Sequence, residues 1–270
     1  MLRGTRRGVA HRPDVICYRE RWVLPISTRP LEDGVVAVDN GRIAYVGSAA
    51  DAPRGDSRAL GDAILMPGLV NAHTHLELIA LWITRLQAVK KAVFDRGQFL
   101  DAARFGLAEG VRAGVTTFAD TCDSGVAFDA MLEAGVRGIM FQEVFGPDPT
   151  VVDASLAELS AKIDAFRPRQ TSLVRVGVSP HAPYSVSDAL FASVARYAAR
   201  HSLPVAVHIA ESEVERQLVE KGAGVFAETL RRRGIAVSTR GRSSIDVLSR
   251  AGVLQGRPLL IHCVRVDVAD

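Results

Sequence analysis

Two histidines separated by one residue, His73 and His75, are the residues of this sequence best suited to binding a metal ion. They follow an apolar run, residues 64–72, that predicts a buried β-strand. Side chains alternate between the two faces of a strand, so both imidazoles would lie on one face and Thr74 on the other. Two imidazoles on one face suit a divalent ion such as zinc. Taken alone, the pair fits two hydrogen-bonded core histidines equally well.

Five of the seven histidines stand at or just past the carboxyl ends of predicted strands. In a parallel barrel, the active site is built at that end of the strands. We therefore expect these five side chains to meet in one pocket although they are far apart in the sequence. They are His73, His75, His181, His208 and His262.

Glu211 follows His208 by three residues and is the candidate general acid/base. Water activated by a metal ion needs a nearby base that takes a proton and later passes it to the leaving group. The alternative is a carboxylate that, together with Glu213, only stabilises the amino-terminal end of a helix. Its position beside His208 favours the catalytic interpretation.

His181 and His262 are candidates for contact with a substrate. Pro180 and Pro183 hold the loop around His181 extended and stiff, which suits an imidazole presented to a substrate; a rigid turn with an incidental histidine is the alternative. His262 ends the last predicted strand, where a neutral imidazole could orient water or polarise the substrate. The adjacent Cys263 would point to the opposite face and pack in the core.

The elements that must position these side chains form two groups. Residues 14–62 predict short strands and turns, with a hairpin at Asn40-Gly41. From residue 64 on, strands and helices alternate, which predicts a parallel sheet, either doubly wound or closed into a barrel. The predicted strands are Ile64–Asn71, Val115–Ala119, Gly138–Val144, Val174–Ser179, Pro204–His208 and Pro258–Cys263, and the predicted helices are Gln98–Arg112, Val126–Glu133, Val152–Phe166, Ser187–Arg200 and Glu213–Arg233.

Composition narrows the class of protein. With 270 residues, 48% of them hydrophobic, the chain can bury a large core. The net charge of +3 is small and the arginines are dispersed, so we expect Arg231–Arg233 to be a solvated helix end and expect no nucleic-acid partner. No GxGxxG or GxxxxGK[ST] pattern follows a predicted strand, so nothing supports a dinucleotide or P-loop site.

The cysteines and the apolar runs indicate the cellular compartment of the protein. Cys17, Cys122 and Cys263 are widely separated, which argues against a disulfide framework and fits a reducing compartment, so we expect the cytoplasm. The arginine-rich start is not followed by an apolar stretch of signal-peptide length, and no run of about 18 or more apolar residues occurs. We expect a small-molecule substrate and no membrane.

Four motifs together resemble the amidohydrolase superfamily, over essentially the whole chain. The likeness is greatest to its mononuclear deaminase and chlorohydrolase branch, which includes deaminases of adenosylhomocysteine, methylthioadenosine and aminofutalosine as well as triazine hydrolases. The motifs are Pro67–His75, His181–Tyr184, His208–Glu211 and Ile261–Cys263.

This resemblance implies roles for the candidate residues. His73, His75 and His208 would bind one divalent ion, usually zinc and in some members iron; Glu211 would shuttle protons and His262 would assist water activation. His181 would contact the substrate. Binuclear branches use a carboxylated lysine after the fourth barrel strand, and no lysine occurs between residues 162 and 221 here, so one ion is expected.

Two further glutamates are candidates for substrate contact. Glu77 follows the histidine pair in an order similar to that of the aminofutalosine-deaminase-like group, and Glu143 closes the third strand. A solvated or helix-capping role is the alternative for each.

The resemblance also implies the fold: a (β/α)8 TIM-type barrel over residues 63–270, with about six of its eight strands present, and a small amino-terminal β-sandwich subdomain over residues 1–62. The family's fourth protein ligand, an aspartate after the eighth strand, would lie beyond residue 270. We therefore expect a C-terminally truncated chain with exposed strand edges, unstable or aggregating unless another chain covers them, and depressed turnover. The family favours a homodimer or larger assembly.

The expected activity is hydrolysis of a carbon–nitrogen bond other than a peptide bond, most simply deamination of an amino-substituted, purine-nucleoside-like heterocycle. Two alternatives remain open from the sequence. The same site could remove a halide or hydrolyse an amide, or the chain could be a non-catalytic homologue with a structural role.

Overall fold

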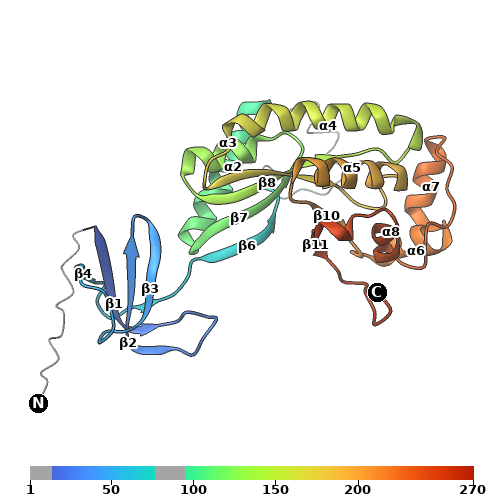
Figure 1. Cartoon of the computed structure of the whole chain (residues 1–270). Helices are drawn as coiled ribbons and strands as arrows, with labels where there is room; N and C mark the ends of the chain where they lie inside the picture. Colours follow the sequence, from blue (N-terminus) through green and yellow to red (C-terminus); the bar gives the residue numbers. More distant parts are fainter. Residues whose placement is uncertain (1–13, 77–94) are drawn as a thin grey trace, which may run out of the picture. The chain divides into compact units, whose positions relative to one another are not determined.

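The computed structural model describes residues 14–76 and 95–270 (Figure 1). The chain divides into two compact units, Met1–Gly68 and Leu69–Asp270. Strand β5 (Ile64–Leu65) pairs with a strand of the first unit. The domain boundary predicted between residues 62 and 63 stays a proposal.

The described part of the first unit is built around a five-stranded sheet. Its strands run in the order β3-β2-β1-β4, with β5 also paired to β1. The predicted hairpin at Asn40-Gly41 is confirmed: it joins β2 to β3, and both residues have positive φ. Alternate residues of β1 and β2 form a small core of Val15, Cys17, Val35 and Ala37. The strands are β1 (Val15–Val23), β2 (Leu31–Asp39), β3 (Arg42–Ser48) and β4 (Asp56–Ala59).

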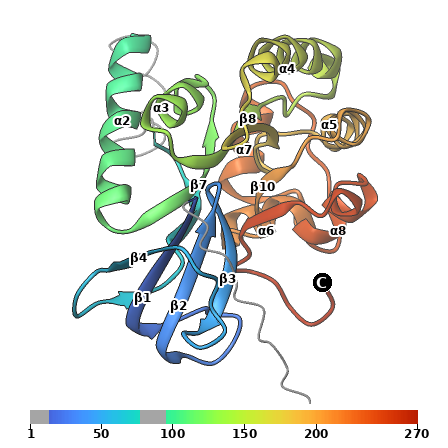
Figure 2. The ribbon, with the colours of Figure 1, turned by 60° about the vertical axis from the view of Figure 1, so that its left-hand side comes forward.

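The described part of the second unit carries six parallel strands in chain order (Figure 1, Figure 2). Four form one sheet, two form another, and a parallel bridge between Val178 and Val205 links the two sheets. This is the expected α/β architecture, a partial TIM-type barrel. The strands are β6 (Leu69–Thr74), β7 (Val115–Cys122), β8 (Arg137–Val144) and β9 (Val174–Pro180), followed by β10 (Ala206–Ile209) and β11 (Leu259–His262).

Helices connect these strands, and capping residues set where several of them begin. Asp95 forms a capping box with Gln98, and the side chains of Ser187, Ser212 and Ser243 cap three later helices. The helices are α2 (Arg96–Arg112), α3 (Val126–Ala134), α4 (Val152–Phe166), α5 (Asp188–His201), α6 (Glu213–Lys221), α7 (Gly224–Arg232) and α8 (Ser244–Arg250).

The structure corrects two of the expected elements. The single strand predicted over residues 64–71 is two strands, because Pro67 and Gly68 separate β5 from β6, and Leu69 and Val70 are exposed rather than buried. The single helix predicted over residues 213–233 is also two, since Gly222 ends α6 in the left-handed conformation. Helix α8 was not expected.

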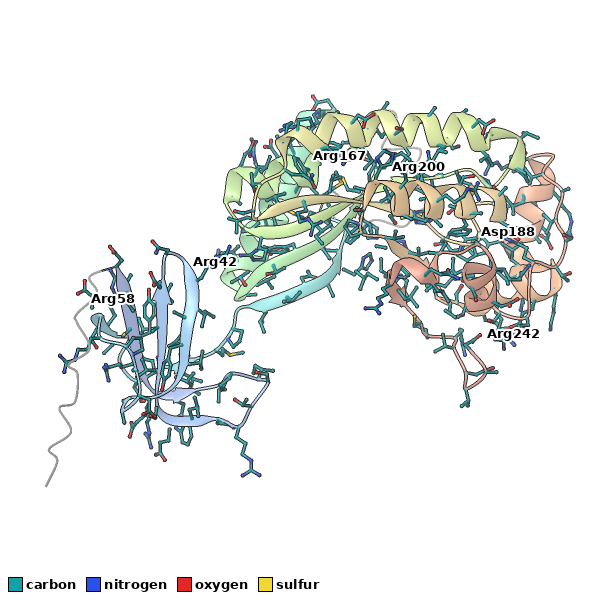
Figure 3. The ribbon with its side chains drawn as sticks, viewed as in Figure 1. Arg42, Arg58, Arg167, Asp188, Arg200 and Arg242 are labelled. Carbon is teal, nitrogen blue, oxygen red and sulfur yellow. The ribbon has the colours of Figure 1, made fainter. Side chains whose placement is uncertain are left out.

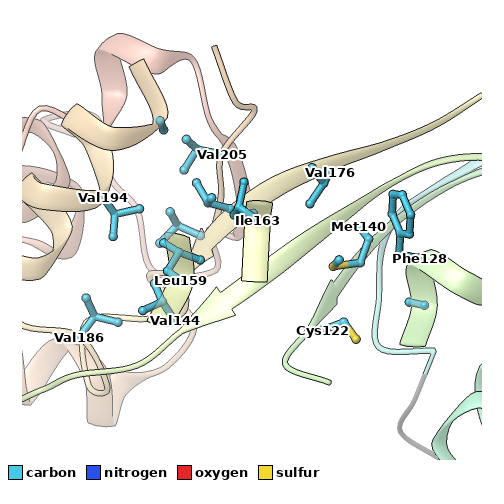
Figure 4. Close-up of a cluster of buried hydrophobic side chains, with 14 of the residues drawn as sticks. Cys122, Phe128, Met140, Val144, Leu159, Ile163, Val176, Val186, Val194 and Val205 are labelled. Atoms are coloured by element: carbon cyan, nitrogen blue, oxygen red, sulfur yellow. The ribbon is translucent and has the colours of Figure 1, made fainter. Parts of the chain in front are cut away.

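The main core of the second unit lies between the helices and the sheet. Figure 4 shows Leu159 and Ile163 of α4 among valines from β8, β9 and neighbouring elements. Continuous burial of apolar residues on both faces is typical of parallel strands covered by helices. This core fixes the strands whose ends carry the candidate site.

Replacing Ile163 with alanine should lower the free energy of unfolding by about 2–5 kcal/mol, the usual cost of a cavity at a fully buried isoleucine. Urea denaturation followed by circular dichroism measures the loss. Asp164→Ala, at the exposed neighbouring position, is the control and should change stability by less than about 0.5 kcal/mol. Equal effects of the two substitutions would contradict the packing of α4.

Basic side chains are dispersed, as expected from the sequence. The arginines that Figure 3 labels are all exposed and come from different elements: Arg42, Arg58, Arg167, Arg200 and Arg242. Arg231–Arg233 are exposed at the end of α7. Among the described residues, no helix combines the length and apolarity that crossing a membrane requires.

Candidate metal centre

The structure gathers the five predicted histidines at the carboxyl ends of β6, β9, β10 and β11. His208 is central: its ring centroid lies 4.9 Å from that of His73, 4.7 Å from that of His181 and 5.5 Å from that of His262. The rings of His75 and His208 are 5.3 Å apart and nearly parallel. Strand topology thus brings together side chains that the sequence separates widely.

The Nε2 atoms of His75 and His208 face each other. His75 Nδ1 lies 2.9 Å from the carbonyl oxygen of Thr121, and His208 Nδ1 lies 3.2 Å from that of His181. A carbonyl oxygen only accepts, so these contacts favour the proton on each Nδ1, although the Thr121 hydroxyl also lies 3.2 Å from His75 Nδ1. In that tautomer, a neutral ring has a lone pair on Nε2. The two Nε2 atoms are 3.3 Å apart. Two lone pairs at this distance repel each other unless a cation lies between them.

The separation of these nitrogens fits zinc. Tetrahedral coordination with zinc–nitrogen distances of about 2.0–2.1 Å places two ligand atoms about 3.3–3.4 Å apart. A proton is a poor substitute for the cation, because burial and then the neighbouring histidines lower the pKa of His208 to about 2. The donor set therefore suits a divalent metal ion.

His73 completes a three-histidine group. One ring nitrogen from each of His73, His75 and His208 lies within 4.8 Å of the others. His73 Nδ1 is buried and has no hydrogen-bond partner among the described residues. Burial, followed by the charges of His75 and His262, lowers the pKa of His73 to about 4. The ring is therefore neutral near pH 7, the form that binds metals.

Two residues near the end of β7 hold His75 and the residue that follows it. Asp120 is fully buried, and its Oδ2 accepts a hydrogen bond from the backbone N–H of Leu76 at 2.6 Å. The next residue, Thr121, supplies the carbonyl that holds His75. Such outer contacts fix the tautomer and direction of a metal-binding imidazole.

Glu211 lies just after β10, beside the histidine cluster. Its Oε1 is 3.8 Å from His262 Nε2, and its Oε2 accepts a hydrogen bond from the Tyr184 hydroxyl at 3.3 Å. Burial and the charge of Glu211 raise the pKa of Tyr184, so the phenol remains a donor. The Glu211 carboxylate is half-exposed and therefore accessible to a small molecule.

His181 and Glu143 also border the cluster. His181 Nδ1 is 2.7 Å from Ser185 Oγ, and its Nε2 is 3.9 Å from a carboxylate oxygen of Glu143. Burial, followed by the charge of His75, lowers the pKa of His181 to about 3, so the ring is neutral. Glu143, His181 and His208 also bring ligand atoms within 4.8 Å of one another.

Backbone strain is concentrated at this end of the sheet. Ala210, His262 and Cys263 have φ angles of +51°, +77° and +51°, in a region that side-chain-bearing residues rarely adopt. Strain of this kind persists where surrounding contacts fix it, and it is common at functional sites. Here Cys263 N donates to Ile209 O at 3.0 Å and Arg265 N donates to Ala210 O at 2.8 Å. The ends of β10 and β11 are thereby fixed against each other.

One predicted site residue, Glu77, lies outside the described residues. Three residues with contacts to the site were not predicted from the sequence: Asp120, Tyr184 and Glu215. Tyr184 stands in the His181–Tyr184 motif, and Glu215 stands three residues after Ser212 in a capping-box pattern, so both had a local signal. Asp120 had none beyond its position at a strand end.

Known proteins similar in sequence to this chain include two deaminases. The 5-methylthioadenosine/S-adenosylhomocysteine deaminase of Syntrophobacter fumaroxidans is 28% identical over 262 residues, which are 90% of this chain and 55% of that protein. The aminodeoxyfutalosine deaminase of Deinococcus radiodurans is 30% identical over 230 residues, 77% of this chain and 53% of that protein. This chain spans about half the length of these curated relatives.

A solved structure and a family model add to these likenesses. The crystal structure of an adenosine deaminase from Xanthomonas campestris with bound zinc superposes with a TM-score of 0.69 at 28% identity, covering 91% of this chain and 56% of that one. Residues 64–236, more than half of the chain, match the model of the Amidohydrolase family. The chain belongs to the amidohydrolase family.

Proposed function

We propose that this protein is a zinc-dependent aminohydrolase that removes the amino group of a purine-nucleoside-like substrate as ammonia. The observation that carries the proposal is the pair of facing Nε2 atoms of His75 and His208, 3.3 Å apart, with Glu211 just after the strand that carries His208. The names of the relatives support deamination over other hydrolytic reactions. The overall reaction replaces the amino group with a carbonyl at the expense of one water molecule.

His73, His75 and His208 would hold a single ion. When bound, a divalent ion supplies Lewis-acid chemistry, lowering the pKa of water and polarising the carbon that loses the amine. Zinc is the proposed metal because three imidazoles at this spacing suit it and because a similar structure holds zinc.

The remaining side chains would move protons and orient the substrate. Glu211 accepts the proton of the attacking water and returns it to the departing amine, while the Tyr184 hydroxyl holds the carboxylate in place. His262, beside Glu211, orients the water. His181 and Glu143 would contact the heterocycle or its sugar.

The cysteines support a cytoplasmic location. Cys17, Cys122 and Cys263 form no disulfide with one another. This state is typical of a reducing compartment.

The proposal is tested by measuring product release across a panel of heterocycles. Zinc-loaded protein should release ammonia from adenosine, 5′-methylthioadenosine or S-adenosylhomocysteine, and no chloride from a chlorinated triazine. Treatment with a chelator should abolish the release of ammonia, and added zinc should restore it. Chloride release, or the absence of ammonia from every compound, would reject the proposed reaction.

A further inference from the structure

Glu215 is the third residue after the N-cap of α6, a position at which a glutamate usually caps the helix at the protein surface. Ser212 is the N-cap of α6 and its hydroxyl accepts from Glu215 N, so residues 212–215 match the capping-box pattern. In that motif the glutamate bonds the N-cap N–H. The Glu215 side chain instead extends further back along the chain and is fully buried.

The Glu215 carboxylate binds the turn that carries Glu211. Its Oε1 accepts from Ala210 N at 2.8 Å and its Oε2 accepts from Glu211 N at 3.0 Å. Ser244, at the start of α8, lowers the pKa of this carboxyl and so favours its charged form. Both oxygens of one carboxylate therefore fix two successive peptide groups.

The turn at Ala210 has a strained backbone and is hydrogen-bonded to the segment that follows β11. Ala210 has a φ of +51°, which an L-residue rarely adopts without outside support. Its carbonyl accepts from Arg265 N at 2.8 Å, just beyond His262. The conformation of Ala210 thus determines the direction of the chain after β10. It thereby determines where the Glu211 carboxylate lies relative to His262.

We propose that Glu215 is the positioning residue for Glu211, fixing the Ala210 turn so that the Glu211 carboxylate faces His262 and Tyr184. Burying a carboxylate costs free energy, and burial accordingly raises the pKa of Glu215. A solvent-exposed capping residue would be enough to begin the helix, so the burial of Glu215 points to a different role. The inference rests on the proposed function of Glu211 but extends it to a residue that touches neither metal nor substrate.

A double-mutant cycle with Glu215→Gln and Glu211→Gln tests this role. In E215Q, one of the two acceptor oxygens is replaced by an NH2 group. One backbone N–H, of Ala210 or Glu211, then loses its hydrogen bond and faces another donor. In zinc-loaded protein, E215Q should lower kcat about 10–100-fold with KM within about threefold and zinc content unchanged. In the E211Q background the same change should cost less than about threefold. Equal losses in both backgrounds would show a general structural role and overturn the proposal.

Amide hydrogen exchange provides a readout that does not depend on activity. In E215Q, exchange at Ala210 and Glu211 should accelerate at least about tenfold, while amides of β10 keep their protection. Glu213→Gln is the matched control, since Glu213 lies on the same helix, is partly exposed and pairs with Arg216. Unchanged protection at Ala210 and Glu211 overturns the proposal. A wild-type protein that deaminates nothing rejects the proposed function, and the exchange measurement still decides the role of Glu215.

Discussion

Replacing both His73 and His208 with alanine should remove zinc from the purified protein, from about one ion per chain to a trace. The two substitutions take away two of the three imidazoles whose nitrogens lie within 4.8 Å of one another. The remaining His75 offers a single donor, which cannot hold zinc against water, so we expect the affinity to fall far more than the 10–100-fold that loss of an outer-shell partner costs. Elemental analysis and competition with a chromogenic chelator measure both quantities.

The control for this experiment is His201→Ala. His201 ends α5, where its ring lies against Tyr197 and its Nδ1 lies 3.1 Å from the Arg167 guanidinium, remote from the cluster. It should leave zinc content unchanged. Circular dichroism establishes that the double variant is folded. Equal zinc in the wild-type and double-variant preparations would refute a shared site.

The fold was largely predictable from the sequence because its signals are local. Apolar runs alternating with amphipathic segments predict β and α elements, and predicted strands and helices agree with the structure to within a few residues from Val115 to His201. The errors have tertiary causes. Leu69 and Val70 are apolar yet exposed, because β6 pairs only with β7 among the described strands. Gly222 could end a helix or lie within one, and packing decides between the two.

The part of the candidate site that lies at strand ends was predictable from the sequence. Alternation placed His73 and His75 on one face, and parallel topology brought His208 and His262 to them. What the sequence could not supply was the supporting contacts. Asp120 of β7 accepts a hydrogen bond from the backbone N–H of Leu76, just after the neighbouring strand β6. Glu215 accepts hydrogen bonds from two backbone N–H groups that precede its own helix. Such bonds depend on the direction of one buried side chain, which no spacing rule specifies.

Replacing Glu211 with glutamine should reduce kcat for deamination by about 100–10,000-fold, the range that a positioned general acid/base contributes. Glutamine keeps the size of the side chain and can still accept from Tyr184, but it cannot take the proton of water. Zinc content should not change, because Glu211 belongs to neither group of side chains with metal-binding geometry. Steady-state kinetics of ammonia release, with metal analysis of the same preparation, checks both expectations.

The two measurements together separate the roles that Glu211 could have. A loss of zinc along with activity would make Glu211 a ligand rather than a proton carrier, whereas a loss of activity with full zinc is expected only of a residue that transfers protons or orients water. Glu213→Gln, two residues further along and partly exposed, controls for the charge change. It should leave kcat within about twofold, because the surface ion pair that Glu213 forms with Arg216 contributes little. A kcat for E211Q close to that of the wild type would exclude the proton-transfer role.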